Sequence, residues 1–394
     1  MGSTRRISSV AGAVTVTGIL ANTLVAPVLP EIERAFDATP TELGAIVAFA
    51  SLPGVALAPV IGVLADRFGR RTVLLPCLCL FGVGGLAGML APSLGWLLLG
   101  RFLQGSGAAG LVNLAIVILG DTFTGEARAR AIGRNAAVLT AGLAVTPLVG
   151  GALSAIGGWR LSFAPYAIAF PIALAVRATL PPDRPFEVVP LRRQVAGAAP
   201  YLRSLGSLAM IGAGFCAFVL VFGLGITALP LHLDREFGLG AAGRGLVLGL
   251  PAVASVVVSL RMGQLTTRFG TWPLVIWGFV LFAAAFSSVA VAPLLVVVLV
   301  ASLVWGAGEA LTIVTLQAYA TEIAPAAQRG TVVAAWVSGV RAGQAVGPVS
   351  AGGVISAAGT SAAFGFGAVF SAAVGGLLAA ARSRTQGLRS RPAR

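Results

Sequence analysis

The chain consists of twelve long apolar runs separated by short polar segments. Each run is close to the roughly 20 residues that an α-helix needs to cross the hydrocarbon core of a bilayer. The runs show no alternation of apolar and polar residues with a period of two, so they favour helices over a membrane barrel. The predicted spans are residues 9–29, 41–64, 72–91, 95–119, 131–155, 161–180, 207–230, 241–261, 272–291, 293–319, 332–356 and 360–381.

The second half of the chain repeats the first at a constant offset of 201 positions, the distance from Gly62 to Gly263. Residues 62–71 read GVLADRFGRR and residues 263–272 read GQLTTRFGTW. One gapless register held over most of a half is not expected by chance, even in a chain with 52 glycines. The same offset aligns Phe36 with Phe237, Gly142 with Gly343, Pro147 with Pro348, and Gly151 with Gly352.

Composition places the chain in a membrane. Hydrophobic residues make up 57% of it and charged residues 10%, whereas soluble domains average about 25% charged. The net charge is +14, and all 27 basic residues are arginines. With an inside N-terminus, the loops predicted to lie outside hold only Arg34, Arg160, Arg235 and Arg244. The charge therefore indicates topology, with both termini cytoplasmic in an inner membrane, and not nucleic-acid binding.

Residues suited to catalysis or metal binding are few. There is one histidine, and the three cysteines lie inside predicted spans. Residues 105–110 match the G-x-G-x-x-G pattern of dinucleotide sites, but they lie in mid-span without the required preceding strand. We therefore expect no enzyme, no cofactor and no metal site. His232 is expected at the surface, in an outer loop.

Residues 62–71 form a predicted polar loop between spans two and three, in which Asp66 lies among arginines. A basic loop that only sets topology does not need an acid. The segment is similar to the loop between spans two and three of the major facilitator superfamily. That resemblance implies a conformational latch between the two halves, although a solvated loop remains the alternative for Asp121. The latch residues would be Gly62, Asp66, Arg67, Gly69, Arg70, Arg71 and Asp121.

Span four carries Arg101, Gln104, Gly105 and Ala108 on one helical face. An arginine inside a span is expected to face a cavity or a partner. These residues also resemble the span-four motif of the same family. For Asn22 in span one, an interhelical hydrogen bond is as plausible as a cavity position. The predicted substrate-cavity residues are Asn22, Gln104, Asn113, Trp305 and Gln344.

Span five contains a proline that is expected to kink the helix and glycines that permit close helix packing. The segment is similar to the antiporter motif of the drug-exporting branches of the family. Span eleven repeats the pattern, so both helices are predicted to pack at the interface between the halves. The residues are Gly142, Pro147, Gly150 and Gly151 in span five, and Gly343, Pro348 and Gly352 in span eleven.

Glu309 is the one acid among thirteen that lies deep within a predicted span. It lies about 16 Å from the cytoplasmic end of span ten, and Arg341 lies about 15 Å deep in span eleven. We expect Glu309 to exchange protons during transport, with Arg341 and Arg101 as cationic partners. The alternative is a permanent structural ion pair between Glu309 and Arg341.

The chain is thus predicted to be an all-α integral membrane protein of twelve transmembrane helices in two pseudo-symmetric six-helix lobes. The lobes are residues 1–180 and 205–394, joined by a cytoplasmic linker at 181–204. Resemblance to the drug:proton antiporter branch implies proton-coupled efflux of small amphipathic compounds by alternating access. The expected partners are a small-molecule substrate, protons and the bilayer, and we expect a monomer. The alternatives are a sugar or metabolite exporter, a lipid translocase and a nontransporting receptor.

Overall fold

The computed structural model describes residues 2–181 and 191–389, and these residues form helices and no strand. The first half contains α1 (Gly2–Thr23), η1 (Ala26–Val28), α2 (Leu29–Phe36), α3 (Pro40–Phe49), α4 (Pro53–Phe68), α5 (Arg70–Met89), α6 (Leu94–Thr122), α7 (Gly125–Gly157), η2 (Trp159–Ile168) and α8 (Ala169–Thr179). Next come α9 (Leu191–Leu202), α10 (Leu205–Leu220), η3 (Val221–Ala228), α11 (Leu229–Phe237), α12 (Ala241–Ser259), α13 (Met262–Phe269), α14 (Thr271–Ala290), α15 (Leu295–Glu309), η4 (Ala310–Val314), α16 (Thr315–Glu322) and α17 (Ala326–Arg389).

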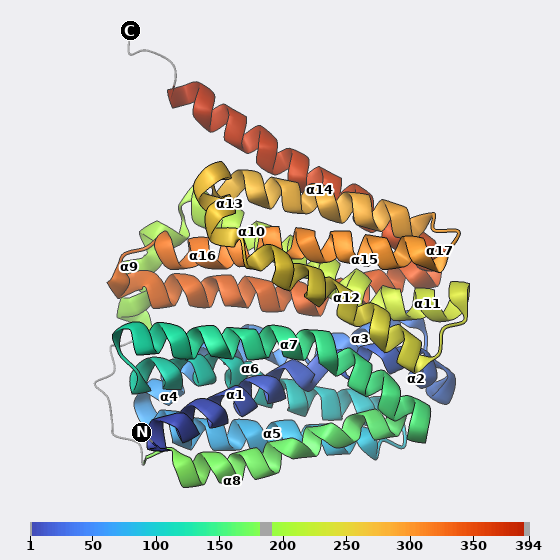
Figure 1. Ribbon diagram of the computed structural model, residues 1–394, viewed down its shortest axis with the longest axis horizontal. Coiled ribbons are helices and arrows are strands. Elements are labelled where there is room, and N and C mark those ends of the chain that lie inside the picture. Colours follow the sequence, from blue (N-terminus) through green and yellow to red (C-terminus); the bar gives the residue numbers. More distant parts are fainter. Residues whose placement is uncertain (1, 182–190, 390–394) are drawn as a thin grey trace.

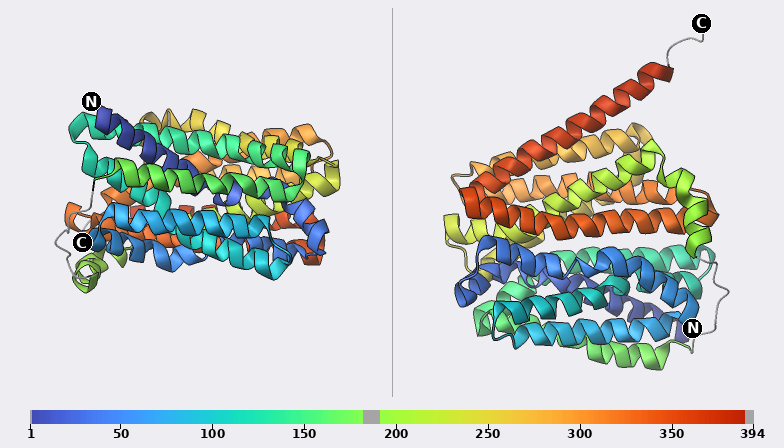
Figure 2. Two further views of the ribbon diagram at one scale, coloured as in Figure 1. Left: turned by 90° about the horizontal axis from the view of Figure 1, so that it is seen from below. Right: turned by 180° about the vertical axis from the view of Figure 1, so that it is seen from behind.

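The described residues contain 11 segments that are long and apolar enough to cross a membrane. The last of them covers 56 residues, Gln328–Ser383, which is far longer than one crossing needs. It consists of two helices that meet at Gly359, where the backbone φ of +85° lies in the left-handed region that glycine adopts readily. Figure 2 shows the chain reversing direction there, so α17 supplies two crossings.

The two halves form two lobes that lie side by side along the bundle. Helices α1–α8 make the lower lobe in Figure 1 and α10–α17 make the upper one. At the interface α7 lies against α12, and α17 lies against α3. The N-terminus and α9 lie toward one end of the bundle, which we name the inner end, and α2 and α11 lie at the other, the outer end. Residues 182–190 of the predicted linker lie outside the described residues, and α9 begins directly after them.

Three predicted span boundaries are wrong in detail. The loop at 62–71 is helical except for Gly69, whose φ of 97° makes the turn between α4 and α5. Residues 120–130, which lie between two predicted spans, are mostly helical, because α6 continues to Thr122 and α7 begins at Gly125. The first predicted span, 9–29, stops short of the helical residues that follow it, because Pro27 and Pro30 each stand at the start of a helical segment, where a missing N–H costs nothing. Hydropathy marks only the lipid-buried part of a helix, so it misses these polar extensions.

Candidate functional site

Arg101 forms the centre of a buried polar cluster in the first lobe. Its guanidinium donates to the carbonyl oxygen of Ile46 at 3.1 Å, and also to the carbonyl of Ala21 and the side-chain oxygens of Asn22 and Gln104. Asn22 in turn donates to Ser51 at 3.1 Å. A guanidinium closed off from solvent needs such acceptors. Arg101 is therefore held by four oxygens of its own lobe.

This cluster changes the interpretation of two predicted cavity residues. Gln104 is fully buried and Asn22 nearly so, and both side chains are partners of Arg101 and do not line open space. Asn113 is exposed, but it lies on another face of α6 from Arg101 and Gln104. The face shared with Ala108 is packed shut as well. Of the two environments expected for Arg101, a cavity or a partner, the structure has the partner. The helices α1 and α3 cover the face of α6 that carries Arg101 and Gln104.

The second lobe carries two charged residues in mid-span that have no such partners. Glu309 is the last residue of α15, and the π-helical segment η4 follows it directly. π-helical interruptions within α-helices are frequently found at functional sites. Within the described residues, no basic side chain lies within salt-bridge distance of Glu309 and no carboxylate within that distance of Arg341. Both side chains are partly exposed. The geometry therefore gives no support to a permanent Glu309–Arg341 pair.

Arg341 reaches toward the other lobe. It donates to Gln344 Oε1 at 3.3 Å. A Cβ built on Gly54 of α4 would lie only 3.2 Å from the Arg341 Cδ atom. This guanidinium thus lies where the lobes meet, and any rotation of one lobe against the other changes its surroundings.

Trp305 lies one helical turn before Glu309 and is buried. Its ring packs against Gly225 in η3, where any Cβ would overlap it, and lies 5.7 Å from the ring of Phe286. Its indole nitrogen has no hydrogen-bond partner in the described structure, and neither has that of Trp336. An indole N–H buried without a partner is uncommon. Among the described residues, the second lobe thus contains two buried indole donors without a partner, and the first lobe contains one buried amide donor without a partner, the Gln104 side-chain nitrogen.

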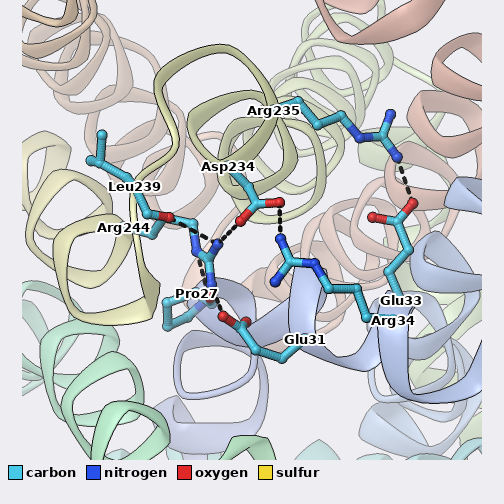
Figure 3. Close-up of polar contacts among 8 residues, drawn as sticks. All are labelled: Pro27, Glu31, Glu33, Arg34, Asp234, Arg235, Leu239 and Arg244. Atoms are coloured by element: carbon cyan, nitrogen blue, oxygen red, sulfur yellow. Dashed lines mark hydrogen bonds and ion pairs between the residues drawn. The ribbon is translucent and has the colours of Figure 1, made fainter.

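Six charged residues tie the lobes together at the outer end, and we call this group the outer latch (Figure 3). Arg34 pairs with Asp234, Arg235 with Glu33, and Arg244 with both Glu31 and Asp234. Arg244 also donates to the carbonyl oxygens of Pro27 at 2.8 Å and Leu239 at 3.0 Å. The acids and arginines balance three to three, and every ion pair except Arg244–Asp234 crosses from one lobe to the other.

The internal repeat explains part of the outer latch. The 201-residue offset relates Glu33 to Asp234 and Arg34 to Arg235, and each arginine pairs with the acid of the opposite copy. Such reciprocal pairs are what two-fold-related lobes produce when equal surfaces meet. The positive-inside pattern predicts only that Arg34, Arg235 and Arg244 lie in outer loops. The signal that could have revealed them is the acid–Arg dipeptide at the same offset.

Arg244 breaks this symmetry, because its counterpart in the first half is Leu43. Its side chain is 0% exposed, whereas Glu31 and Asp234 keep 25% and 15% of their side-chain surface. Four acceptors surround the guanidinium. Arg244 is thus the buried centre of the outer latch.

Glycines allow backbone contact across the lobe interface. A Cβ on Gly151 would overlap the carbonyl oxygen of Ala241, and one on Gly352 would overlap that of Pro40. Gly44 and Gly245 meet Pro348 and Pro147 in the same way. These contacts form two repeat-related pairs. Gly142, Gly150 and Gly343 instead pack inside their own lobes, against Ile19, Leu24 and Phe215.

The residues predicted to form the conformational latch lie together at the inner end, and we call them the inner latch. Arg70 bonds to Asp66 and lies 3.3 Å from Asp121, so one arginine joins α4, α5 and α6. Arg71 donates to the carbonyl oxygen of Leu180 at 3.2 Å, and the Arg67 guanidinium lies 5.3 Å from the ring of Phe68. All these contacts belong to the first lobe. Gly69 forms the turn, and Gly62 borders open space.

His232 corrects another prediction. It lies in α11 with only 2% of its surface exposed, and its Nδ1 is 3.0 Å from Thr360 Oγ1. Burial follows because α11 continues the seventh span and packs against α17.

The family model of the Major Facilitator Superfamily matches residues 11–226 and 210–394, which together cover nearly the whole chain. The chain belongs to the Major Facilitator Superfamily. It is 34% identical to the bacillibactin exporter of Bacillus subtilis over 151 residues, which are 36% of this chain and 37% of that protein. It is 25% identical to multidrug resistance protein 1 of the same bacterium over 251 residues, 63% of each chain. The puromycin resistance protein pur8 of Streptomyces alboniger is 35% identical over 171 residues, 42% of this chain and 33% of that one.

Solved structures agree on the fold. A bacterial homologue of the human lysosomal transporter Spinster, in an inward-facing and unoccupied conformation, superposes with a TM-score of 0.76 at 20% identity, covering 96% of this chain and 95% of that one. The nucleoside transporter NupG gives a TM-score of 0.79 at 11% identity, covering 95% and 99%. These likenesses show that the chain has the fold of this superfamily, and its curated relatives include proteins named as an exporter and as resistance proteins.

Proposed function

We propose that this transporter exports small amphipathic compounds across the cytoplasmic membrane in exchange for protons. Relatives named as exporters and resistance proteins support the direction of transport. The observation that carries the proton coupling is Glu309, a carboxylate in mid-span without a basic partner among the described residues. A charge inside a membrane is costly and generally marks a functional site.

In this proposal the three predicted coupling residues have different roles. Glu309 takes up and releases the proton. Arg341, at the contact with Gly54, approaches or leaves the transport path as the lobes move and favours the deprotonated carboxylate when it is near. Arg101 is saturated by acceptors, so its role is to hold α1, α3 and α6 together. We assign substrate contact to Trp305, whose indole nitrogen has no partner among the described residues, and to Gln344 beside Arg341; both are buried in this conformation, so the assignment requires that movement of the lobes uncovers them.

Purified protein in proteoliposomes tests this proposal. Glu309→Gln is expected to bind substrate and exchange it passively, but not to concentrate it when a pH difference is imposed. Glu322→Gln is the matched control, because Glu322 is an exposed acid further along the same span. Uphill, proton-driven transport that survives in Glu309→Gln would exclude Glu309 as the coupling residue.

The substrate class needs a separate assay. Expression in an efflux-deficient host, with puromycin and amphipathic dyes as probes, should raise resistance, and a protonophore should abolish that gain. An unchanged susceptibility profile would argue against drug export.

A further inference from the structure

A crevice of about 800 Å³ lies between the inner halves of α1 and α7. Figure 1 shows α1 passing α7 near mid-bundle and diverging from it toward the N-terminus. The volume is in the range of ligand-binding pockets, about 300–1,000 Å³. The crevice is lined by Thr4, Arg5, Ser8, Ser9, Gly12, Ala13, Val16, Phe123, Ala127, Arg130, Ala131, Arg134, Asn135 and Val138.

The lining changes from polar to apolar along the crevice. Arg5 and Ser8 lie toward the N-terminal end of α1, whereas Ala13 and Val16 lie deeper, beside Val138 of α7. From residue 4 to residue 16 an α-helix rises about 18 Å, and one leaflet is roughly 15 Å of hydrocarbon. The crevice thus runs through about one leaflet, with its charged end at the membrane surface.

The charge of the crevice is positive and partly uncompensated. Its lining contains three arginines and no acid. Arg130 is paired with Glu126 at 2.9 Å. Arg5 and Arg134 have no carboxylate within salt-bridge distance in the described part of the chain. Two guanidinium groups with several donors each therefore lie at the polar end of a crevice whose deeper lining includes Ala13, Val16 and Val138.

We propose that this crevice binds an anionic phospholipid of the inner leaflet, with the phosphate on Arg5 and Arg134 and an acyl chain along Gly12, Ala13 and Val16. Guanidinium groups bind phosphate through paired hydrogen bonds, and basic pockets between transmembrane helices bind anionic lipid headgroups. The two helices connect the crevice to other parts of the molecule. Helix α7 packs on α12 of the other lobe, and α1 is followed in the chain by η1 and by α2, which carries acids of the outer latch. A lipid in the crevice braces α1 against α7, a helix of the lobe interface.

Binding can be measured on the full-length protein in neutral detergent with added phosphatidylglycerol or phosphatidylcholine. Phosphatidylglycerol should raise the melting temperature of the wild type, whereas phosphatidylcholine should not. The Arg5→Gln/Arg134→Gln double variant should bind phosphatidylglycerol at least about tenfold more weakly, since each arginine near an anionic lipid contributes about fivefold in affinity. Arg261→Gln/Arg268→Gln removes the same charge from exposed inner-end positions and should bind like the wild type.

Gly12→Leu tests the acyl-chain part independently. A Cβ at Gly12 meets no atom within 4 Å, so the larger side chain fills the crevice without disturbing the fold. It should weaken binding of the long-chain lipid but not of a short-chain phosphatidylglycerol. Equal binding by both double variants would overturn the proposal. Equal protection by inorganic phosphate would assign the site to a free anion, and displacement of the lipid by a transported compound would place the crevice on the transport path; either result would also overturn it.

Discussion

The two ends of the molecule hold charge in different ways. At the outer end, the outer latch joins the two lobes around a guanidinium with no solvent-exposed surface. At the inner end, Arg70 joins Asp66 and Asp121 within one lobe, and the two acid side chains are about half exposed, at 50% and 49%. Removing one partner of a buried ion pair costs about 3–5 kcal/mol, whereas exposed pairs contribute about 0–1 kcal/mol. Among the described residues, the ion pairs that join the two lobes in this conformation lie at the outer end.

The glycine contacts beside the outer latch give the largest expected effect. Gly151→Leu or Gly352→Leu should abolish transport, because each new side chain meets a backbone carbonyl of the other lobe that cannot move aside as a side chain can. Gly353→Leu is the control, since a Cβ there meets nothing within 4 Å. Proteoliposome flux measures the result. Normal export by both bulky variants would refute the packing role of the interface.

Arg244 comes next. Arg244→Gln should open the outer end, because Glu31 and Asp234 lose their shared buried cation at a cost of about 3–5 kcal/mol. Spin labels at Leu90 and Val291, which are repeat-related and highly exposed, should report a longer distance between the lobes. Arg160→Gln is the matched control, because Arg160 bonds to Ala91 of its own lobe. If both variants keep the wild-type distance, Arg244 is not the centre of the latch.

The inner latch should have a smaller influence on transport than Arg244. Asp66→Asn removes one of the acids that contact Arg70 and should slow transport by less than about tenfold, since the Asp66 side chain is half exposed. Labels at Thr124 and Pro325, in repeat-related inner loops, should show the population moving toward the state that is open at the inner end. An unchanged distance distribution would mean that these residues do not act as a conformational latch.

The smallest effect concerns one peripheral pair of the outer latch. Arg34 is 61% exposed at its side chain, so a double-mutant cycle of Arg34→Gln and Asp234→Asn should give a coupling energy of about 0.2–1 kcal/mol. The cycle of Arg235 and Glu33 should give a similar value by repeat symmetry. Unfolding of the purified protein in denaturant gives these energies. A coupling energy as large as the stability lost in Arg244→Gln would contradict the expected difference between the buried centre of the outer latch and its exposed Arg34–Asp234 pair.

The expected spans agree with the structure because crossing a bilayer is a local property. A run of apolar residues of sufficient length has few alternatives to a helix, since backbone groups in lipid must bond within their own segment. The repeat can also be detected from the sequence, and it predicts that Pro147 and Pro348 occupy equivalent places in the two halves. It could not show that the acid–Arg pairs at 33–34 and 234–235 would face one another, because a repeat in sequence does not say which surfaces meet.

The sequence by itself determined the class of protein, the approximate spans, the two related halves and the presence of two unusual charges, Glu309 and Arg341, within spans. Only the tertiary structure decided how each charge is compensated. Arg101 and Arg341 look alike in sequence, yet the first is surrounded by oxygens of α1, α3 and α6 and the second meets Gln344 and the other lobe. The physical reason is that the cost of a charge in a membrane depends on neighbours brought together by packing, many of them far away along the chain.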